Sequence, residues 1–352
     1  MFFSKKNTLI GLDIGSRSIK IAEMDVKKSG DYVLKKFGMT PIAPGVVEDG
    51  AIRKPELVAE AIRQLIGDYK IKETNVATSI GGYSVIVKNI SVQKMDEEQL
   101  QETIQFEAEQ YIPYDINDVN LDFQIQGENE DNPNQMDVTL VAAKKDMIND
   151  YVSLMQSAGL TLCIIDVSAF ALQNIYEVNY ELGDDCVALI DIGANNTTLN
   201  ILKNANSRFM RDVSLGCQQV IARIASDAGV PEDEAEKMFL GQGADGQLSS
   251  KDALEIVTSM ASDWCAEIRR ALDFFYSQNP GEQISRIVLS GGGSNIDKFR
   301  ELLAAETSCD VEMINPFEEV RLDNSLDTAY LETVAPQAAI CMGLAIRRLD
   351  DK

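Results

Sequence analysis

Two strand–turn–strand units, far apart along the chain, set the tightest limit on its possible folds. The first contains Asp13-Ile14-Gly15 between apolar segments, and the second contains Asp191-Ile192-Gly193 in the same setting. Apolar residues on both sides of a glycine turn predict two short strands joined in a hairpin. Two copies in a chain of 352 residues indicate an internal duplication rather than a long repeat array. We therefore expect an α/β protein with two related lobes.

An aspartate that ends a buried strand just before a glycine turn suits a phosphorylated ligand. Glycine lets backbone N–H groups approach phosphate oxygens closely, and a carboxylate can hold hydrated Mg²⁺. A further glycine-rich segment, Gly291-Gly292-Gly293, follows the apolar strand expected at Ile284–Leu289. The three segments together predict a nucleotide cleft between two lobes. The alternative interpretation is a set of tight hairpins with no ligand.

Composition excludes several classes of function. The chain carries 56 acidic and 32 basic residues, a net charge of −24, and no long run of Lys or Arg. Such a chain repels nucleic acid, so we expect no nucleic-acid partner. It has no histidine, which removes Ser-His-Asp and Cys-His catalysis and His-ligated zinc. Chemistry must come from carboxylates, lysines, backbone amides or a bound cation.

The sequence shows no sign of export or membrane insertion. The first residues lack an apolar stretch of signal-peptide length, and no segment reaches the ~18 apolar residues of a membrane span. The six cysteines are scattered without a C-x-x-C pair, and we expect most of them to be buried thiols. These features favour a soluble cytoplasmic protein.

The motifs resemble those of the superfamily of ATPases that contains actin, Hsp70 and the sugar kinases. This resemblance implies an actin-like fold, with two ribonuclease-H-like lobes around an ATP–Mg²⁺ site. It implies that Asp13 and Asp191 hold Mg²⁺ through water, and that Asp166 orients water near the γ-phosphate. The implied nucleotide-contacting residues are Gly15, Ser16, Arg17, Ser18 and Lys20 in the first phosphate loop, Gly193, Ala194, Asn195, Asn196 and Thr197 in the second, and Gly216, Glu234, Lys237, Gly291, Gly292, Gly293 and Asn295 around adenosine.

Each of these assignments has a plainer alternative. Lys20 can be an ordinary strand lysine, Glu234 and Lys237 can lie on a solvated helix face, and Asp166 can cap the following helix. Arg17 and Asn196 are bulkier than the glycines found in many related phosphate loops, and they can crowd the pocket. The segment Gly241–Gly246 matches G-x-G-x-x-G, but it follows a polar helix instead of a strand, so we interpret it as a loop.

The middle of the chain points to one branch of the superfamily. Residues 107–116, 121–123, 141–145 and 157–160 closely resemble the PilM family of type IV pilus assembly proteins, whose nearest relative with a similar insert is FtsA. We expect residues 1–84 to begin the first lobe and residues 85–160 to form an inserted α+β subdomain. Residues 161–352 would complete the first lobe, form the second lobe and adenosine region, and return a final helix (Val334–Leu349) to the first lobe.

Membership of this family implies a binding role in preference to rapid ATP turnover. The family docks the cytoplasmic N-terminal tail of the inner-membrane protein PilN and works with other pilus platform or motor proteins. Its members are cytoplasmic and peripheral to the inner membrane, and the chain's polar C-terminal end favours indirect membrane association. We expect the tail in a groove between the first lobe and the insert, near Ile112, Pro113 and Tyr114.

Three alternatives remain open at this point. Residues 111–114 can simply end a helix and bury their own aromatic rings. The chain can be a small-molecule kinase, which would form ADP rapidly with an acceptor, or an actin-like filament, which would assemble with ATP. Slow hydrolysis without an acceptor would favour the scaffold, and the rate of hydrolysis and the oligomeric state are left undetermined.

Overall fold

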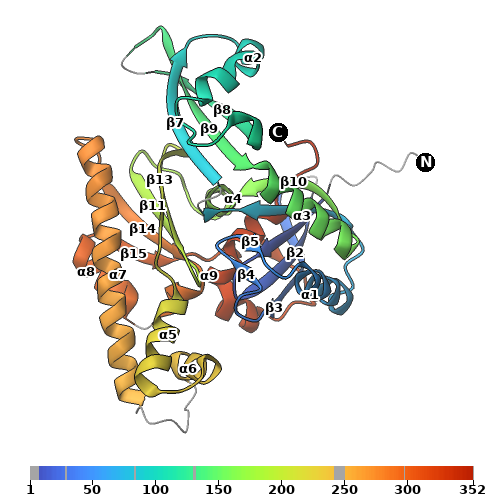
Figure 1. The fold of residues 1–352 in the computed structure, drawn as a ribbon, viewed down its shortest axis with the longest axis vertical. Coiled ribbons are helices and arrows are strands. Elements are labelled where there is room, and N and C mark those ends of the chain that lie inside the picture. Colours follow the sequence, from blue (N-terminus) through green and yellow to red (C-terminus); the bar gives the residue numbers. More distant parts are fainter. Residues whose placement is uncertain are drawn as a thin grey trace.

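Two large lobes and a smaller inserted subdomain make up the molecule (Figure 1). The computed structural model describes residues 8–27, 30–82, 85–129, 132–241, 250–296 and 298–351. Residues 242–246 of the G-x-G-x-x-G segment therefore lie outside the described part. Within that part, no helix combines the length and apolar composition needed to cross a bilayer.

The two lobes contain sheets of the same design. The first sheet has the order β10-β6-β1-β2-β3-β16, and the second has the order β13-β12-β11-β14-β15. In both, an antiparallel three-strand meander lies beside a parallel strand, because β1 pairs with β6 and β11 pairs with β14. The duplication predicted from two short motifs therefore extends to whole sheets. The strands are β1 (Ile10–Ile14), β2 (Ser18–Val26), β3 (Tyr32–Pro41), β6 (Asn75–Ile80), β10 (Thr161–Val167), β11 (Cys186–Ile192), β12 (Thr197–Lys203), β13 (Asn206–Val213), β14 (Ile284–Ser290), β15 (Asp310–Met313) and β16 (Arg321–Leu322).

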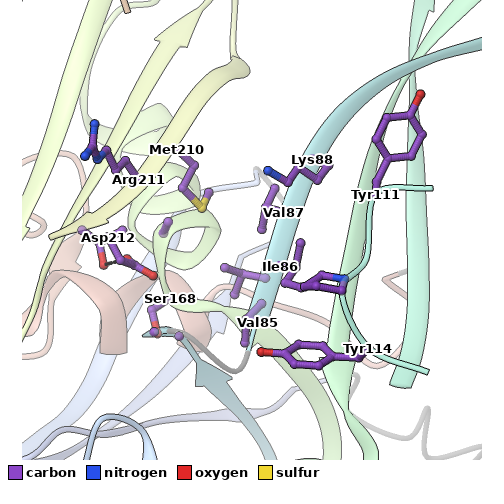
Figure 2. Close-up of a pocket in the computed structure, with 16 residues that line it drawn as sticks. Val85, Ile86, Val87, Lys88, Tyr111, Tyr114, Ser168, Met210, Arg211 and Asp212 are labelled. Carbon is purple, nitrogen blue, oxygen red and sulfur yellow. Dashed lines mark hydrogen bonds between the residues drawn. The ribbon is translucent and has the colours of Figure 1, made fainter. Parts of the chain in front are cut away.

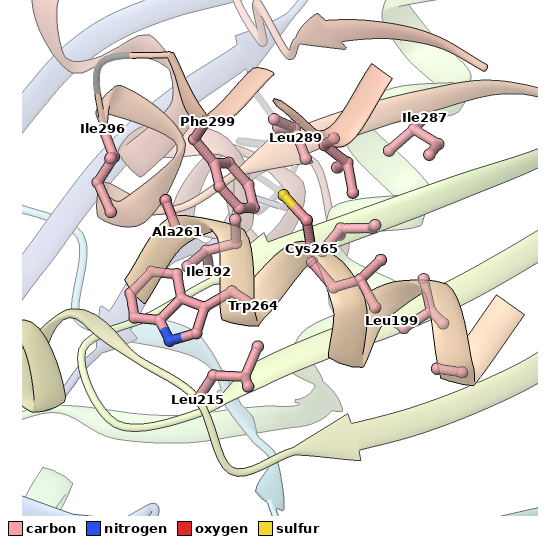
Figure 3. Close-up of a cluster of buried hydrophobic side chains, with 14 of the residues drawn as sticks. Ile192, Leu199, Leu215, Ala261, Trp264, Cys265, Ile287, Leu289, Ile296 and Phe299 are labelled. Atoms are coloured by element: carbon pink, nitrogen blue, oxygen red, sulfur yellow. The ribbon is translucent and has the colours of Figure 1, made fainter. Parts of the chain in front are cut away.

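Helices cover the faces of both sheets. Helices α1 (Pro55–Asp68) and α3 (Lys145–Ala158) pack on the first sheet, while α5 (Cys217–Ala228), α7 (Ser250–Gln278) and α8 (Phe299–Thr307) pack on the second. Helix α6 (Glu232–Phe239) packs on α5 and α7. The core of the second lobe includes Trp264 against the edge of the Phe299 ring, with Ile192 beside them (Figure 3). Burial of Ile192 fixes the strand end that presents Asp191.

Helices α4 (Ser168–Asn179) and α9 (Thr328–Ala345) lie between the two sheets, in a core that contains residues of both lobes. Helix α9 is apolar on nearly every side, as expected of a fully buried helix. It begins at Thr328 and ends at Ala345, so the predicted range Val334–Leu349 is shifted. Asp327 caps the N-terminus by accepting from the Tyr330 N–H at 3.1 Å, and this earlier start carries Pro336 inside the helix.

The inserted subdomain has its own small core. Strands β7 (Val85–Gln93), β9 (Gln135–Lys144) and β8 (Val119–Glu128) form an antiparallel sheet in that order, covered by α2 (Glu97–Ala108). The expected range 85–160 also contains α3. The buried side chains of α3, including Tyr151 and Leu154, belong to the core of the first lobe instead. The insert's own core therefore ends with β9.

Close packing of α9 generates a stability prediction. A Cβ added to Gly343 would lie 1.8 Å from the Ala171 carbonyl oxygen on α4, whereas one added to Gly67 on α1 would meet nothing within 4 Å. We expect Gly343→Ala to lower the free energy of unfolding by at least ~2 kcal/mol, since overpacking forces the two helices apart. Gly67→Ala is the matched control and should raise stability by ~0.5–1 kcal/mol. Urea unfolding measures both, and equal midpoints would contradict the packing argument.

Candidate nucleotide cleft and partner groove

The two duplicated aspartates and one lysine meet where the lobes face each other. Lys20 on β2 is paired with Asp13 on β1 in the strand register, and its Nζ donates to Asp13 Oδ2 at 2.8 Å. Both residues are 8% exposed. Asp191, from the equivalent strand end of the second lobe, interacts electrostatically with both of them. The structure therefore brings the two predicted metal-binding carboxylates to one place.

Burial and charge set the protonation of this cluster. Burial alone lowers the pKa of Lys20, but the neighbouring Asp13 and Asp191 carboxylates raise it above its usual value, so the ammonium stays charged. Burial raises the pKa of Asp191 to about 6; the neighbouring Asp13 charge adds to this rise, and the charge of Lys20 opposes it. Two carboxylates and one ammonium group leave a net negative charge, which favours the binding of a cation.

The glycine turns after the two aspartates are alike in detail. The Gly15 N–H donates to the Ser18 carbonyl at 3.0 Å, and the Gly193 N–H donates to the Asn196 carbonyl at 3.0 Å. Ser16 and Ser18 are half-buried in the first turn, and Ala194 and Asn195 in the second. Thr197 is buried, and its hydroxyl donates to the Leu215 carbonyl at 3.0 Å. The predicted phosphate-loop residues thus form two matched turns.

Two further glycines allow the backbone to pack closely against the second turn. Gly291 has a φ of +82°, and a Cβ there would lie 2.4 Å from the Ile192 carbonyl oxygen and 2.9 Å from Asp191 Oδ1. A Cβ on Gly216, which precedes α5, would lie 2.2 Å from the Ala194 carbonyl oxygen. Any side chain at either position would displace the aspartate or its turn.

Two polar contacts join the lobes at these turns. Asn196 Nδ2 donates to Asp49 Oδ1 at 3.1 Å, in the hairpin of β4 (Val47–Glu48) and β5 (Ala51–Ile52). Arg17 forms an ion pair with Glu236 on α6. The sequence identified Arg17 and Asn196 but not Asp49 or Glu236. No local motif marks these two acidic residues, because their partners lie in the opposite lobe.

The remaining predicted adenosine residues lie near this boundary with different exposure. Glu234 is half-buried and Lys237 exposed on α6, the helix that carries Glu236. Gly292, Gly293 and Asn295 form a short 3-10 helix (Gly292–Asn295) after β14. Asn295 is exposed, while Gly293 is buried, and a Cβ there would lie 2.2 Å from Ile192 Cγ2. Gly293 therefore has a packing role in this structure.

Asp166 lies at the end of β10 with both carboxylate oxygens engaged. Its Oδ1 accepts from the Val167 N–H at 2.8 Å, and its Oδ2 accepts from Arg347 Nη1 at 2.7 Å. Burial raises the pKa of Asp166, and the Arg347 charge opposes this rise. The ion pair with Arg347 was not identified from the sequence. It holds the carboxylate against a residue that lies two positions beyond the end of α9.

These residues fit a nucleotide with Mg²⁺ held mainly by phosphate and water. Among the described residues, no group of three or more Asp, Glu, Cys or His side chains could enclose a metal ion. Mg²⁺ often keeps several waters and uses one or two protein carboxylates together with substrate phosphates. Asp13 and Asp191 would supply those carboxylates, and Gly216 and Gly291 let the backbone pack closely around the turn that follows Asp191.

A cavity of about 470 Å³ lies between the insert and the second lobe (Figure 2). Tyr114 and β7 line one side, while Met210, Arg211 and Asp212 of β13 line the other. Pro113 also lines this groove, but Ile112 is 6% exposed and lies in the core of the insert. The groove is bounded by the second lobe as well as by the segment Gly81-Gly82 of the first lobe. The sequence predicted a groove between the insert and the first lobe alone.

The walls of this groove are open strand edges. Among the described residues, β7 pairs with β9 alone and β13 with β12 alone, so each strand lies at the edge of its sheet. Asn89 Nδ2 on β7 donates to the carbonyls of Ser207 and Arg208 on β13 at 2.8 and 3.3 Å. This side chain links the insert to the second lobe at one end of the groove.

Comparison with known proteins agrees with this architecture. A chain solved as a "PilM-PilN type IV pilus biogenesis complex" has 25% identity and a TM-score of 0.86, over 98% of this chain and 100% of that one. The ethanolamine utilization protein EutJ from Carboxydothermus hydrogenoformans has 13% identity and a TM-score of 0.58, over 96% and 89% of the two chains. MreB 5 of Spiroplasma citri bound to AMPPNP has 12% identity and a TM-score of 0.52, over 96% and 95%.

These matches confirm the actin-like fold expected from the motifs. The family model described as type IV pilus assembly protein PilM matches residues 11–349. The resemblance noted in residues 107–116 therefore extends over nearly the whole chain, and the protein belongs to the PilM family of type IV pilus assembly proteins.

Proposed function

We propose that this protein is an ATP–Mg²⁺-binding scaffold of type IV pilus assembly. The observation that carries the proposal is the meeting of Asp13, Lys20 and Asp191, from duplicated strand ends, between two glycine turns. Bound Mg²⁺ would neutralise phosphate charge next to the two carboxylates. Lys20 stays cationic beside them and is suited to hold a phosphate oxygen.

Binding, in preference to rapid turnover, is the role that this site supports. Fast hydrolysis needs a group that orients or deprotonates the attacking water. Asp166, the expected residue for this task, is held by an ion pair with Arg347 and by the Val167 N–H, and the guanidinium charge makes it a weaker base. The chain has no histidine to replace it. We therefore expect slow ATP hydrolysis with no dependence on an acceptor molecule.

The groove between β7 and β13 is the proposed docking site for the N-terminal cytoplasmic tail of PilN. A chain with a TM-score of 0.86 to this one was solved as a PilM–PilN complex, which supports PilN as the partner. Two open strand edges suit an extended segment, because each offers backbone N–H and C=O groups to it. Through this tail the protein would lie on the cytoplasmic side of the inner membrane, among other platform or motor proteins.

Nucleotide binding would affect the shape of this groove through Asn196. This residue belongs to the second phosphate turn and hydrogen-bonds Asp49 in the first lobe. A Cβ on Gly82, which lines the groove, would lie 3.5 Å from the Asp49 carbonyl oxygen and 3.9 Å from Asn196 Nδ2. Thr198 also lines the groove and follows the same turn. A shift of the turn on nucleotide binding would therefore move the groove floor.

The first prediction concerns Asp191. Asp191→Asn should weaken Mg²⁺–ATP binding about tenfold or more at pH 7.5, as loss of a carboxylate next to a metal usually does. Because its pKa is raised to about 6, wild-type Asp191 gains a proton below that pH and resembles the variant. The affinity gap between the two proteins should therefore close as pH falls from 7.5 to 5. Calorimetric titration at each pH measures the gap, and comparison with the variant cancels protonation of ATP itself. If the difference in ATP affinity between the two proteins stays constant with pH, Asp191 does not have the proposed role beside Mg²⁺.

The second prediction concerns the groove. Met210→Asp and Tyr114→Ala should each weaken binding of a PilN tail peptide by about tenfold, since both residues line the cavity. Phe106→Ala is the matched control, because Phe106 is 70% exposed on the insert but does not line this groove. Fluorescence anisotropy with a labelled peptide measures all three. If only the Phe106 variant changes the affinity for the peptide, the docking site lies on α2 instead of in the groove.

The third prediction concerns coupling between the two sites. Asp49→Ala removes the partner of Asn196 without changing either phosphate turn. ATP should change the affinity for the tail by the 5–150-fold common in allosteric proteins. In the Asp49 variant, the ratio of tail affinities with and without ATP should be close to one. Glu48→Ala, which removes an exposed neighbour paired with Arg53, should leave the ratio unchanged. A wild-type ratio in the Asp49 variant would exclude this route.

A further inference from the structure

Asp212 supplies a carboxylate to the groove between the insert and the second lobe. Among the described residues that line this cavity, it is the one acidic side chain. It lies on β13 opposite Thr198 of β12, and its Oδ1 accepts from the Thr198 hydroxyl at 2.7 Å. Asp212 is half-buried, so the fold holds one carboxylate oxygen in place while the side chain still borders the cavity (Figure 2).

No cation in the described part of the chain pairs with this carboxylate. Burial raises the pKa of Asp212, and the Thr198 hydrogen bond opposes the rise without the help of a Lys or Arg charge. Lys88 and Arg211 line the same cavity, but Figure 2 shows the Arg211 guanidinium directed away from Asp212 and Lys88 on the β7 wall. A partly buried carboxylate without a counterion is costly, so the groove offers an unused site for a positive charge.

The surroundings of Asp212 narrow the kind of cation that fits. Apolar side chains line much of the cavity, namely Val85, Ile86, Val87, Val167, Ala169 and Met210. The stem of a Lys or Arg side chain can pack on such walls, and a low dielectric strengthens the contact between its charged end and a carboxylate. A metal ion would find a single carboxylate here, whereas divalent cations take several oxygen ligands. The chemistry therefore favours a basic side chain.

We propose that Asp212 binds one basic side chain of the PilN tail and thereby fixes where the tail lies in the groove. The inference rests on the tail docking proposed above, and it adds the chemistry that the second lobe recognises. Lys88 and Arg211 would repel the same side chain at other points of the cavity, so charge favours one placement. Thr198, which holds Asp212, belongs to the strand that leaves the second phosphate turn.

Fluorescence anisotropy with a labelled PilN tail peptide tests this assignment in the full chain. Asp212→Asn removes the charge but keeps an oxygen that can accept from Thr198. It should weaken tail binding about tenfold or more, since loss of one member of a partly buried charge pair is costly. Asp122→Asn, at an exposed aspartate of β8 outside the groove, is the matched control and should equal wild type. Neither variant should lower the urea unfolding midpoint, because each keeps its local hydrogen bond.

Peptides in which each Lys or Arg is replaced in turn by Gln identify the partner of Asp212. One such replacement should weaken binding to the wild-type protein by about tenfold. The same replacement should change binding to Asp212→Asn by less than about twofold, because the charge pair is already broken there. A peptide with Glu at that position should bind Asp212→Lys more tightly than it binds the wild-type protein.

Other outcomes would overturn the proposal, and they separate it from the docking site itself. Wild-type tail affinity in Asp212→Asn would show that the carboxylate contacts no cation of the tail. Equal losses for every peptide, without coupling to a basic residue, would leave Asp212 only its structural contact with Thr198. If Met210→Asp and Tyr114→Ala weaken tail binding while Asp212→Asn does not, this inference alone fails. If none of the three variants weakens it, the groove is not the docking site, and the proposed function fails there as well.

Discussion

The buried charge cluster at the centre of the molecule explains why the two lobes need each other. Asp13 and Lys20 form an ion pair that is almost fully removed from water, and Asp191 approaches them from the second lobe. Burying charges is costly unless they are paired, and here the carboxylates outnumber the ammonium group. The protein alone leaves one negative charge uncompensated. A bound cation would compensate this charge, so the most costly part of the fold is also the part suited to bind a cation.

The rest of the architecture holds this cluster in place. Ile192 in the second core fixes Asp191, and α9 packs against β1 beside Asp13, where a Cβ on Gly11 would lie 2.4 Å from the Cys341 carbonyl oxygen. The Pro336 carbonyl of the same helix accepts from the Gly291 N–H at 2.9 Å and from Ser290 Oγ at 3.0 Å. One helix therefore contacts both lobes at the strand ends that carry the charges.

Local patterns were enough to predict the repeated parts of this fold. Hairpins around Asp13 and Asp191 follow from apolar strands and glycine turns, and their duplication placed the two carboxylates together. Contacts across the lobes, Arg17 with Glu236 and Asn196 with Asp49, depend on how two separately folded units meet. No sequence spacing encodes that arrangement.

Other differences between the predictions from sequence and the structure have equally specific causes. The start of α9 was misplaced because Asp327, an N-cap residue, precedes a proline that the finished helix accommodates. Strand β13 was not identified, since its polar residues are typical of an exposed edge. Ile112 was expected in the groove with its neighbours, but the chain turns after α2 and places it in the insert's core. Pro113 and Tyr114 line the groove, and Tyr114 also packs against that core.

The link made by Asn89 limits how any segment can lie against β7. Its amide occupies the Ser207 and Arg208 carbonyls of β13, so the gap between the two strand edges closes at that point. The open length of β7 is then the short stretch Val85–Lys88, all four residues of which line the cavity. A chain docked along β7 would meet a fixed stop at Asn89, and because strand side chains alternate between faces, that stop would set which of its residues face each side of the groove.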